Sequence, residues 1–234
     1  MGHVISQIIT LPHTCLRIFN NLHDEMTHSV TAHIVIRDLG CQDYRVTLQA
    51  MQAFTDQRQP QTADEIWFVE HPPVYTRGMS CQLVPFSNNA IEVVDTDRGG
   101  QITYHGPGQQ MMYTLLDLRR LGIGVRRLVS VLEQSIIAVL TAQGVAAERR
   151  AGAPGVYVGG AKIAALGLRV RRGCCYHGLC LNNNPDLAPF AAIDPCGYPD
   201  LPVTSLQQLG VRVSAEILQQ QLYAHLNSQL GCEL

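Results

Sequence analysis

The sequence predicts an α/β fold for a single domain, and three features of its 234 residues support this. Short runs rich in β-branched and aromatic residues alternate with amphipathic helical segments along most of the chain. A hydrophobic content of 46%, a charged content of 15% and a mean hydropathy of +0.04 are typical of a compact soluble protein. No linker or repeat divides the chain, and no apolar run approaches the roughly 20 residues that a membrane span needs.

In the first half of the chain, the pattern predicts one helix among several strands. Apolar residues at helical spacing from Tyr44 to Phe54 predict the helix. The two prolines within His71 to Thr76 remove ladder hydrogen bonds, so this stretch is expected in a turn or at a sheet edge. The predicted strands are residues 32–37, which Leu39-Gly40 ends, then 65–70, 91–94 and a strand bracketed by glycines within 98–109.

In the second half, two long helices frame a group of strands. Met111 to Leu118 is apolar on both faces, as expected of a central strand. Apolar positions from Val125 to Leu140 predict a helix that ends at Gly144, and Ser214 is expected to cap a C-terminal helix through Leu230. The other predicted elements are a hairpin of strands 156–158 and 163–168 around Gly159-Gly160, strands at 168–171 and 175–181, a loop at 182–185 and a short helix at 204–209.

Residues 1–28 differ from the rest and are predicted to be a disordered extension ahead of a domain of residues 29–234. The start Met-Gly-His-Val-Ile-Ser fits the myristoylation pattern, but this pattern is short, is often matched by chance and matters only in a eukaryotic host. No small-residue cleavage site follows, so a signal peptide is not expected. The lack of an acidic residue before Asp24 leaves a transit peptide open, whereas a disordered extension could lie upstream of a true translation start at Met26.

The eight cysteines, two of them adjacent at Cys174 and Cys175, lack the spacing of a secreted disulfide framework. We expect thiols in a reducing compartment, the cytoplasm or, for a eukaryotic source, the mitochondrion. The cluster that ends at Cys180 suggests zinc, but the knuckle spacing is missing, and on a strand Cys175 and His177 would face away from Cys174 and Cys180. No metal site is predicted, and these cysteines are expected to be small core residues.

Charge is unevenly distributed along the chain. Residues 98–172 hold eleven basic and three acidic residues, although the whole chain carries a formal charge of −2. A positive region of this kind would attract an acidic protein or a nucleic acid, whereas arginines scattered over a solvated surface are the alternative.

Lys162 is the only lysine in the chain, and the other sixteen basic residues are arginines. Arginine cannot lose its proton in a protein, whereas a buried lysine can serve as an acid or a base. The segment that contains Lys162 ends in Asp194-Pro195-Cys196-Gly197, a rigid turn in which Cys196 could present its sulfur to a cleft. A cysteine nucleophile with a lysine partner is therefore the working hypothesis, and chance survival of one lysine is its alternative.

The stretch from Arg98 to Gln109 combines several glycines with a fixed cation, Arg98, and a titratable group, His105. Glycines let a ligand approach the backbone closely, so a binding loop is one interpretation. A tight hairpin with a core histidine is the other.

Five blocks of the sequence together resemble the octanoyl-[acyl carrier protein]:protein octanoyltransferases, within the biotin/lipoate protein ligase superfamily. The blocks are HPPVYTRG from His71, RGGQITYHGPGQQMMY from Arg98, APGVYVGGAKIAALGLRVRRG from Ala153, YHGLCLN from Tyr176 and DPCGY from Asp194. The resemblance implies a central mixed sheet flanked by helices, with a second, smaller sheet. Asp194 and Cys180 depart from the asparagine and alanine common in the family, and neither departure removes a needed group.

The resemblance also implies the site. Cys196 would carry the acyl thioester, and Lys162 would lower the pKa of that cysteine and move protons. The residues expected to line the acyl pocket are Arg98, Gly99, Gly100, Gln101, Ile102, Thr103, Tyr104, His105, Ala165, Leu166, Gly167, Gly178, Leu179 and Cys180.

The reaction so implied moves octanoate from acyl carrier protein to a lysine of a lipoyl domain, without a cofactor and without ATP. The expected acceptors are lipoyl domains of 2-oxoacid dehydrogenase E2 subunits and the glycine-cleavage H protein, and the enzyme is expected to be a monomer that binds neither nucleic acid nor membrane. The lack of a phosphate-binding glycine loop fits this reaction. The alternatives are an ATP-dependent lipoate or octanoate ligase, a scaffold for acylated carrier proteins, and a thioesterase or cysteine protease.

Overall fold

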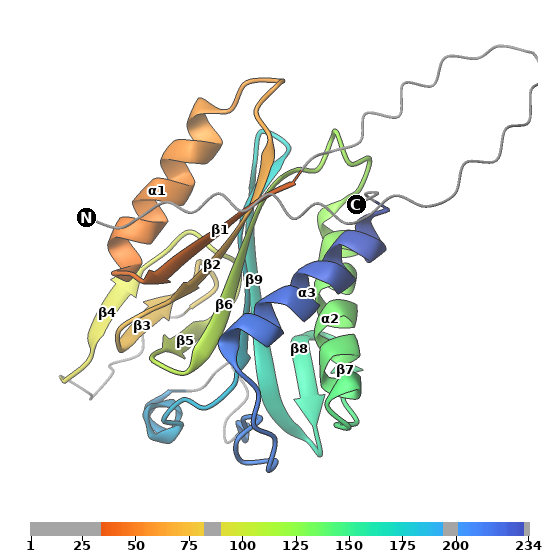
Figure 1. Ribbon diagram of the computed structural model, residues 1–234. Helices are drawn as coiled ribbons and strands as arrows, with labels where there is room; N and C mark the ends of the chain where they lie inside the picture. Colours follow the sequence, from red (N-terminus) through yellow and green to blue (C-terminus); the bar gives the residue numbers. More distant parts are fainter. Residues whose placement is uncertain (1–33, 82–89, 194–200, 232–234) are drawn as a thin grey trace, which may run out of the picture.

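The computed structural model describes residues 34–81, 90–193 and 201–231 of the chain (Figure 1). The elements are, in order, β1 (Ile34–Cys41), α1 (Tyr44–Gln57), β2 (Asp64–Glu70), β3 (Val74–Arg77), β4 (Glu92–Asp95), β5 (Ile102–His105), β6 (Gln109–Asp117), α2 (Val125–Ala142), β7 (Glu148–Arg150), β8 (Ala153–Val158), β9 (Ala161–Arg171), β10 (Cys174–Asn182), a short 3₁₀ helix (Ala188–Ala192) and α3 (Ala215–Leu230).

The strands form two sheets of unequal size. The larger sheet has seven strands in the order β1-β2-β6-β10-β9-β8-β7, in which β1 and β2 are parallel and the other neighbours are antiparallel. The smaller sheet has the order β4-β3-β5. This confirms the expected α/β fold with a large mixed sheet, a smaller sheet and flanking helices.

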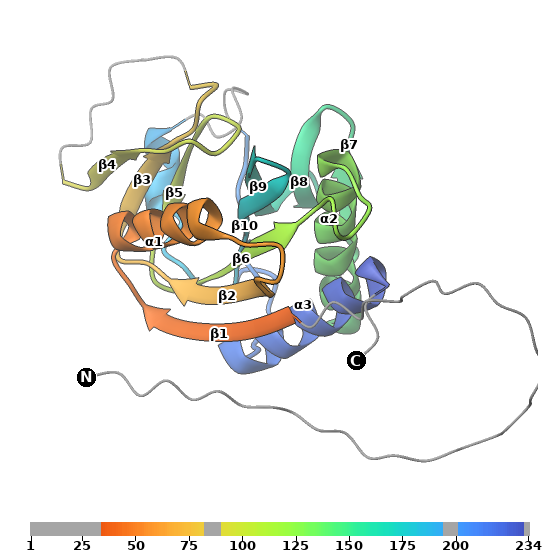
Figure 2. The same cartoon turned by 90° about the horizontal axis from the view of Figure 1, so that it is seen from above.

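The large sheet is covered on both faces, as Figure 2 shows from above. On one face, leucines of α2 and α3 such as Leu132 and Leu222 are fully buried against Met112 and other sheet residues. On the other face, α1 and the small sheet pack over Trp67 and Tyr176. Both faces of the central strands are therefore apolar, which explains why β6 reads as a continuous hydrophobic run. Among the described residues, no helix is long and apolar enough to cross a membrane.

The helix ends follow from local sequence. The side chain of Asp43 accepts a hydrogen bond from the backbone nitrogen of Val46 at the start of α1, and Ser214 does the same for Ile217 at the start of α3. The α3 cap confirms the prediction for Ser214. Gly231 ends α3 with a φ of +71°, a left-handed conformation that glycine adopts easily.

Three predictions about individual elements are wrong. The strand β3 lies at the centre of the small sheet, because its two prolines fall in the preceding turn and leave the ladder groups of Val74–Arg77 free to pair. The strand β1 continues through Gly40 to Cys41, with a register shift that accommodates the glycine. The helix predicted at 204–209 is absent, because residues 206–210 form hydrogen-bonded turns instead. The predicted extension, residues 1–28, lies outside the described residues.

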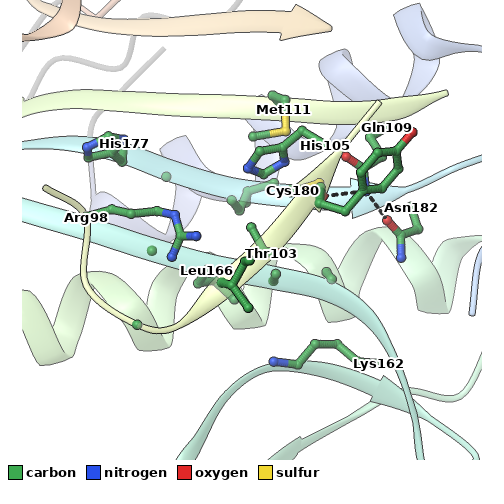
Figure 3. A pocket seen from close by; sticks show the side chains of 18 of the residues that line it. Arg98, Thr103, His105, Gln109, Met111, Lys162, Leu166, His177, Cys180 and Asn182 are labelled. Carbon is green, nitrogen blue, oxygen red and sulfur yellow. Dashed lines mark hydrogen bonds between the residues drawn. The ribbon is translucent and has the colours of Figure 1, made fainter. Parts of the chain in front are cut away.

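Between the small sheet and the strands β6, β9 and β10 lies a cavity that draws its lining from both sheets (Figure 3). Phe190 of the 3₁₀ helix and Val203 of the following segment contribute to the same lining. The packing of one sheet over the other thus creates the cavity that concerns function.

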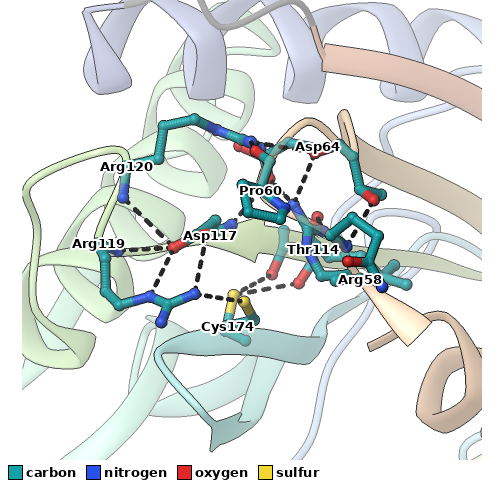
Figure 4. A network of polar contacts seen from close by, with 12 residues as sticks. Arg58, Pro60, Asp64, Thr114, Asp117, Arg119, Arg120 and Cys174 are labelled. Atoms are coloured by element: carbon teal, nitrogen blue, oxygen red, sulfur yellow. Dashed lines mark hydrogen bonds and ion pairs between the residues drawn. The ribbon is translucent and has the colours of Figure 1, made fainter. Parts of the chain in front are cut away.

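A buried ionic cluster at the start of β2 joins segments that are distant in sequence (Figure 4). Asp64 is fully buried, and its Oδ1 contacts Arg58 and lies 2.6 Å from Nη2 of Arg120. The same oxygen accepts a hydrogen bond of 2.8 Å from the backbone nitrogen of Asp117 at the end of β6. One carboxylate therefore neutralises two arginines and ties β2 to β6.

We expect Asp64→Ala to lower the free energy of unfolding by about 3–5 kcal/mol, because it leaves two arginines without their shared partner. The control is Asp56→Ala, which removes an exposed ion pair with Arg171 at 2.9 Å and should cost about 0–1 kcal/mol. Urea denaturation of the two variants beside the parent protein measures both values. Equal losses would show that burial does not set the strength of the Asp64 cluster.

Candidate active site

The cavity between the sheets contains most of the residues that the sequence singled out. Its empty space, counted together with the open solvent at its mouth, measures about 780 Å³. Every predicted binding residue except Gly99 lines it, and so does Lys162. The structure therefore brings together Arg98, Gly100, Gln101, Ile102, Thr103, Tyr104, His105, Ala165, Leu166, Gly167, Gly178, Leu179 and Cys180.

Arg98 is held rigidly at one side of the cavity. It is 8% exposed, and its Nη2 donates to the backbone oxygen of Thr76 at 2.7 Å and to the Thr76 hydroxyl at 2.9 Å. The backbone nitrogen of Gly99 donates to the oxygen of Leu168 at 3.0 Å. Gly99 therefore ties the Arg98 segment to β9, although it does not line the cavity itself.

Two glycines let the cavity walls approach closely. Gly167 of β9 pairs with Gly178 of β10. A β-carbon at Gly178 would lie 2.0 Å from the backbone oxygen of Met112, and one at Gly167 would lie 2.9 Å from Cδ of Arg98. These positions therefore require glycine because any side chain would collide with β6 or with Arg98.

Three buried histidines lie at or beside the cavity. His71 contacts the backbone oxygen of Gln42 through Nδ1 and the Tyr113 hydroxyl through Nε2, at 2.7 and 2.8 Å. His105 stacks on the ring of Tyr44 with a centroid distance of 5.7 Å. Burial is the main cause that lowers the pKa of all three histidines, and the pKa of His105 falls well below its ordinary value. At neutral pH these histidines are therefore uncharged.

His177 does not lie on the side that strand alternation predicts. Its φ is +62°, a left-handed value that is rare outside glycine. Its ring consequently stacks on the ring of neighbouring Tyr176 at 5.0 Å, and its Nε2 lies 2.9 Å from Oδ1 of Asp97. The prediction that His177 shares a face with Cys175 is thus wrong, because the period of two holds only for a regular strand.

Asp97 receives several hydrogen bonds at this point. The Tyr176 hydroxyl donates to Oδ2, and Gln52 donates to the same oxygen at 3.2 Å. Burial acts to raise the pKa of Asp97, but the hydrogen bonds from His177 and Tyr176 outweigh it and lower that pKa. Asp97 thereby keeps its charge and fixes the orientation of the His177 ring.

Lys162 is 4% exposed and is held at both backbone and side chain. Its backbone nitrogen donates to Pro202 at 2.7 Å, and its backbone oxygen accepts from Thr204 at 3.0 Å. Its Nζ donates to the backbone oxygen of Pro154 at 3.2 Å and lies 5.3 Å from the ring centre of Tyr157. Figure 3 shows the Lys162 side chain on a separate part of the chain from Arg98 and His105.

Cys196, the predicted nucleophile, lies outside the described residues. The described chain on each side of it reaches the cavity region. Three residues before it, Ile193 is buried with Tyr104, and six residues after it, Pro202 binds the backbone of Lys162. The chain therefore enters and leaves the Cys196 segment beside cavity-lining residues.

Sequence reasoning missed several residues at the cavity. Tyr44, Met111, Tyr113 and His177 line it, and His71 lies directly behind Tyr113. His71 and Tyr113 stand in blocks that carry the family resemblance, so that signal was available. Tyr44 had no such signal, because it appeared only as one apolar position of a helix.

The basic residues of the 98–172 window lie on several different elements. Arg98 is buried in the cavity wall, and Arg126 and Arg127 begin α2. Arg119, Arg120 and Arg171 form ion pairs with Asp117, Asp64 and Asp56. Part of the positive charge of this region is therefore buried or paired with carboxylates. Among the described residues, no cluster of three or more His, Cys, Asp or Glu side chains could hold a metal ion.

Comparison with known proteins identifies the class to which this fold and site belong. The profile of the lipoyl protein ligase A/B catalytic domain matches residues 43–227, and the chain belongs to that family. Within it, the chain is 54% identical to an octanoyltransferase of Alkalilimnicola ehrlichii over 201 residues, which cover 86% of this chain and 94% of the relative. It is 58% identical to an octanoyltransferase of Thiobacillus denitrificans over 186 residues, covering 78% and 84%. The family expected from the sequence is thereby confirmed.

Solved structures share the fold at low sequence identity. A lipoate-protein ligase A bound with ATP aligns with a TM-score of 0.68 at 15% identity, covering 84% of this chain and 85% of that one. A biotin protein ligase from Aquifex aeolicus, in complex with biotin and ATP, aligns with a TM-score of 0.54 at 11% identity, covering 85% and 70%. At these identities the likeness concerns the fold alone.

The buried histidines predict how stability depends on pH. Their pKa values are lowered in the folded protein, so the unfolded chain takes up protons that the folded protein does not when the pH falls below about 6.5. The free energy of unfolding should be greatest above that pH. Below it, the free energy of unfolding should fall by up to about 1.4 kcal/mol per pH unit for each histidine. Urea denaturation at pH 7.5, 6.5 and 5.5 measures this slope.

His105→Gln should reduce the slope by the share of one histidine. The lowered pKa of Asp97 does not interfere, because its contribution is lost only as the pH falls below about 3.8. A stability that stays constant from pH 7.5 to 5.5 would contradict the prediction.

Proposed function

We propose that this protein transfers an octanoyl group from octanoyl-acyl carrier protein to a lysine of a lipoyl domain, through a thioester on Cys196. The observation that carries the proposal is that Lys162 and the three predicted binding segments line one cavity. The high identity to curated octanoyltransferases supports the choice of acyl group. The acceptors that we propose are the lipoyl domains of 2-oxoacid dehydrogenase E2 subunits and the glycine-cleavage H protein.

In the first half-reaction, the Cys196 thiolate attacks the carbonyl carbon of the carrier-protein thioester. A new carbon–sulfur bond forms to Cys196, the bond to the pantetheine sulfur breaks, and that sulfur leaves as a thiolate, to which the Lys162 ammonium gives a proton and so becomes neutral. A cation beside Cys196 favours its charged form, and Lys162 is the proposed source of that positive charge.

In the second half-reaction, the amine of the acceptor lysine attacks the acyl-cysteine carbonyl. A carbon–nitrogen bond forms, the bond to the Cys196 sulfur breaks, and the amine loses a proton to a base, for which we propose the neutral form of Lys162. A thioester is more reactive than the amide that replaces it, so the transfer proceeds without ATP.

The cavity suits an acyl chain because most of the side chains that line it are apolar or are polar without a charge. Leu166, Leu179 and Met111 provide apolar surface, and burial keeps His105 and His177 neutral. Arg98 and Lys162 are the basic exceptions, but Nη2 of Arg98 is already bonded to Thr76, and Nζ of Lys162 is bonded to the backbone oxygen of Pro154. An eight-carbon chain could therefore enter without leaving an ionised group unpaired.

The covalent intermediate gives the first functional test. We expect intact-protein mass spectrometry to show one octanoyl adduct after mixing with octanoyl-acyl carrier protein, and none with Cys196→Ala. Hydroxylamine should remove the adduct because it cleaves thioesters, and a lipoyl domain should discharge it.

Cys41→Ser is the matched control, because Cys41 is an exposed thiol remote in sequence from the site. It should acquire the adduct as the parent protein does. If no adduct forms, and the lipoyl domain is modified only when ATP and free octanoate are supplied, the protein is a ligase and the transferase proposal fails.

Arginines at the end of β9 are the proposed docking site for the acidic carrier protein. Arg171 is exposed and pairs with Asp56, and Arg172 is exposed in the turn to β10. Arg169 contacts the sulfur of Met79 at 3.1 Å, next to the Leu168 oxygen that binds Gly99. Arg169 therefore lies beside the segment that carries Arg98, and Arg171 and Arg172 follow it toward the turn to β10, where an acidic partner could be attracted.

Reversal of Arg169, Arg171 and Arg172 to glutamate should raise the KM for octanoyl-acyl carrier protein by at least about tenfold, since like charges then face the carrier. The control is Arg126→Glu with Arg127→Glu and Arg212→Glu, which changes net charge equally at exposed positions elsewhere. Steady-state kinetics at low salt measures both. An unchanged KM, or an equal rise in the control, would reject this docking site.

A further inference from the structure

Glu133 is a carboxylate in a place where carboxylates are rarely found. It belongs to α2, is 7% exposed, and neighbours the fully buried Leu132 and Ile136 on that helix. Burying a carboxylate costs free energy unless hydrogen bonds compensate it. The reaction steps above do not use Glu133, so its presence in the helix–sheet interface needs another explanation.

The side chain of Glu133 binds one particular peptide group of β8. Its Oε1 accepts a hydrogen bond of 3.0 Å from the backbone nitrogen of Gly155. The carbonyl of the same peptide group belongs to Pro154, and it accepts the hydrogen bond of 3.2 Å from Nζ of Lys162. A single peptide group therefore has the Glu133 carboxylate at its N–H and the Lys162 amine at its C=O.

The backbone around this peptide group is shaped to admit the lysine. Gly155 has a φ of +138°, which side chains disfavour. A β-carbon there would lie 3.0 Å from Cε and 3.3 Å from Nζ of Lys162. The lysine side chain thus lies against backbone that carries no side chain, and its amine is hydrogen-bonded to the carbonyl of the 154–155 peptide.

We propose that Glu133 is a positioning residue for Lys162 and acts through the 154–155 peptide group. The carboxylate holds the N–H of Gly155, which directs the Pro154 carbonyl toward the amine. Hydrogen bonds in series polarise one another, so the charged acceptor at one end strengthens the bond at the other. The proposed function makes this position matter, since Lys162 there serves Cys196 and the acceptor amine.

The alternative is that Glu133 only satisfies a buried N–H group, as any polar residue could. Two variants separate the two roles. Glu133→Leu removes the acceptor but preserves apolar packing, whereas Glu133→Gln retains an oxygen acceptor without its charge. Ser135→Ala is the matched control, because Ser135 is fully buried on the same helix and, within the described part of the chain, its hydroxyl donates a hydrogen bond to Val131 of that helix.

The first measurement is the NMR signal of Lys162 in the full chain labelled with ¹³C- and ¹⁵N-lysine. Because Lys162 is the only lysine, a protein without lysine in any tag gives one set of side-chain signals. In the parent protein and in Ser135→Ala, the two protons on Cε of Lys162 should have different chemical shifts, as expected of an ordered side chain. Glu133→Leu should merge them toward the values of a mobile lysine, and Glu133→Gln should produce a smaller change in the same direction.

The second measurement is steady-state transfer of octanoate to a lipoyl domain. Glu133→Leu should lower kcat by about 10- to 100-fold with little change in KM, as expected for partners that orient a functional group. Glu133→Gln should restore most of the rate, and Ser135→Ala should not alter it.

If neither Glu133 variant changes the Lys162 signal, the proposal is wrong, whatever the rates. Glu133→Gln keeps the hydrogen-bond acceptor, so this outcome can be tested even if Glu133→Leu does not fold. If the signal changes but the parent protein shows no octanoyl transfer, the positioning role stands and the proposed function fails instead.

Discussion

The site depends on how the backbone of Lys162 is fixed between two segments. On one side, Lys162 belongs to β9, an interior strand of the large sheet. On the other, it forms a parallel bridge with Val203, in the segment that follows Cys196 in the chain. A lysine side chain has four rotatable bonds and loses considerable entropy when ordered. Because the backbone of Lys162 is already fixed, the contacts of its amine must offset only the entropy lost by the side chain. The chemistry that we assign to Lys162 rests on this constraint.

The titratable side chains around the cavity beside Lys162 are either neutral or held by hydrogen bonds. Burial removes the proton from three histidines, while Asp97 retains its charge because His177 and Tyr176 bind it. Arg98 is the fixed cation of the wall, bonded to Thr76. Such an arrangement accommodates an apolar acyl chain and still leaves hydrogen-bonding groups at its polar side. The same burial makes the folded protein sensitive to mild acid.

Much of the fold was predictable from local patterns. Strands and helices with strong periodicity, such as β2, β6, α2 and α3, lie where apolar spacing and capping residues predict them. Motif blocks assigned the cavity segments, because those blocks carry the family resemblance. Two of the errors arose where a local rule did not hold in the folded chain. The prolines before β3 lie just outside its ladder of hydrogen bonds, and the positive φ of His177 on β10 turns its side chain to the other face of the sheet.

The sequence by itself determined the class of fold, the family and the interest of Lys162, because these depend on residue types and their spacing. Only the tertiary structure decided that Gly178 cannot carry a side chain because Met112 lies against it, that Asp64 neutralises the distant Arg120, and that Glu133 and Lys162 bind the same peptide group. The physical reason is that these contacts join residues far apart in the chain. Their geometry follows from sheet order, strand register and backbone torsion, none of which a local pattern of residue types specifies.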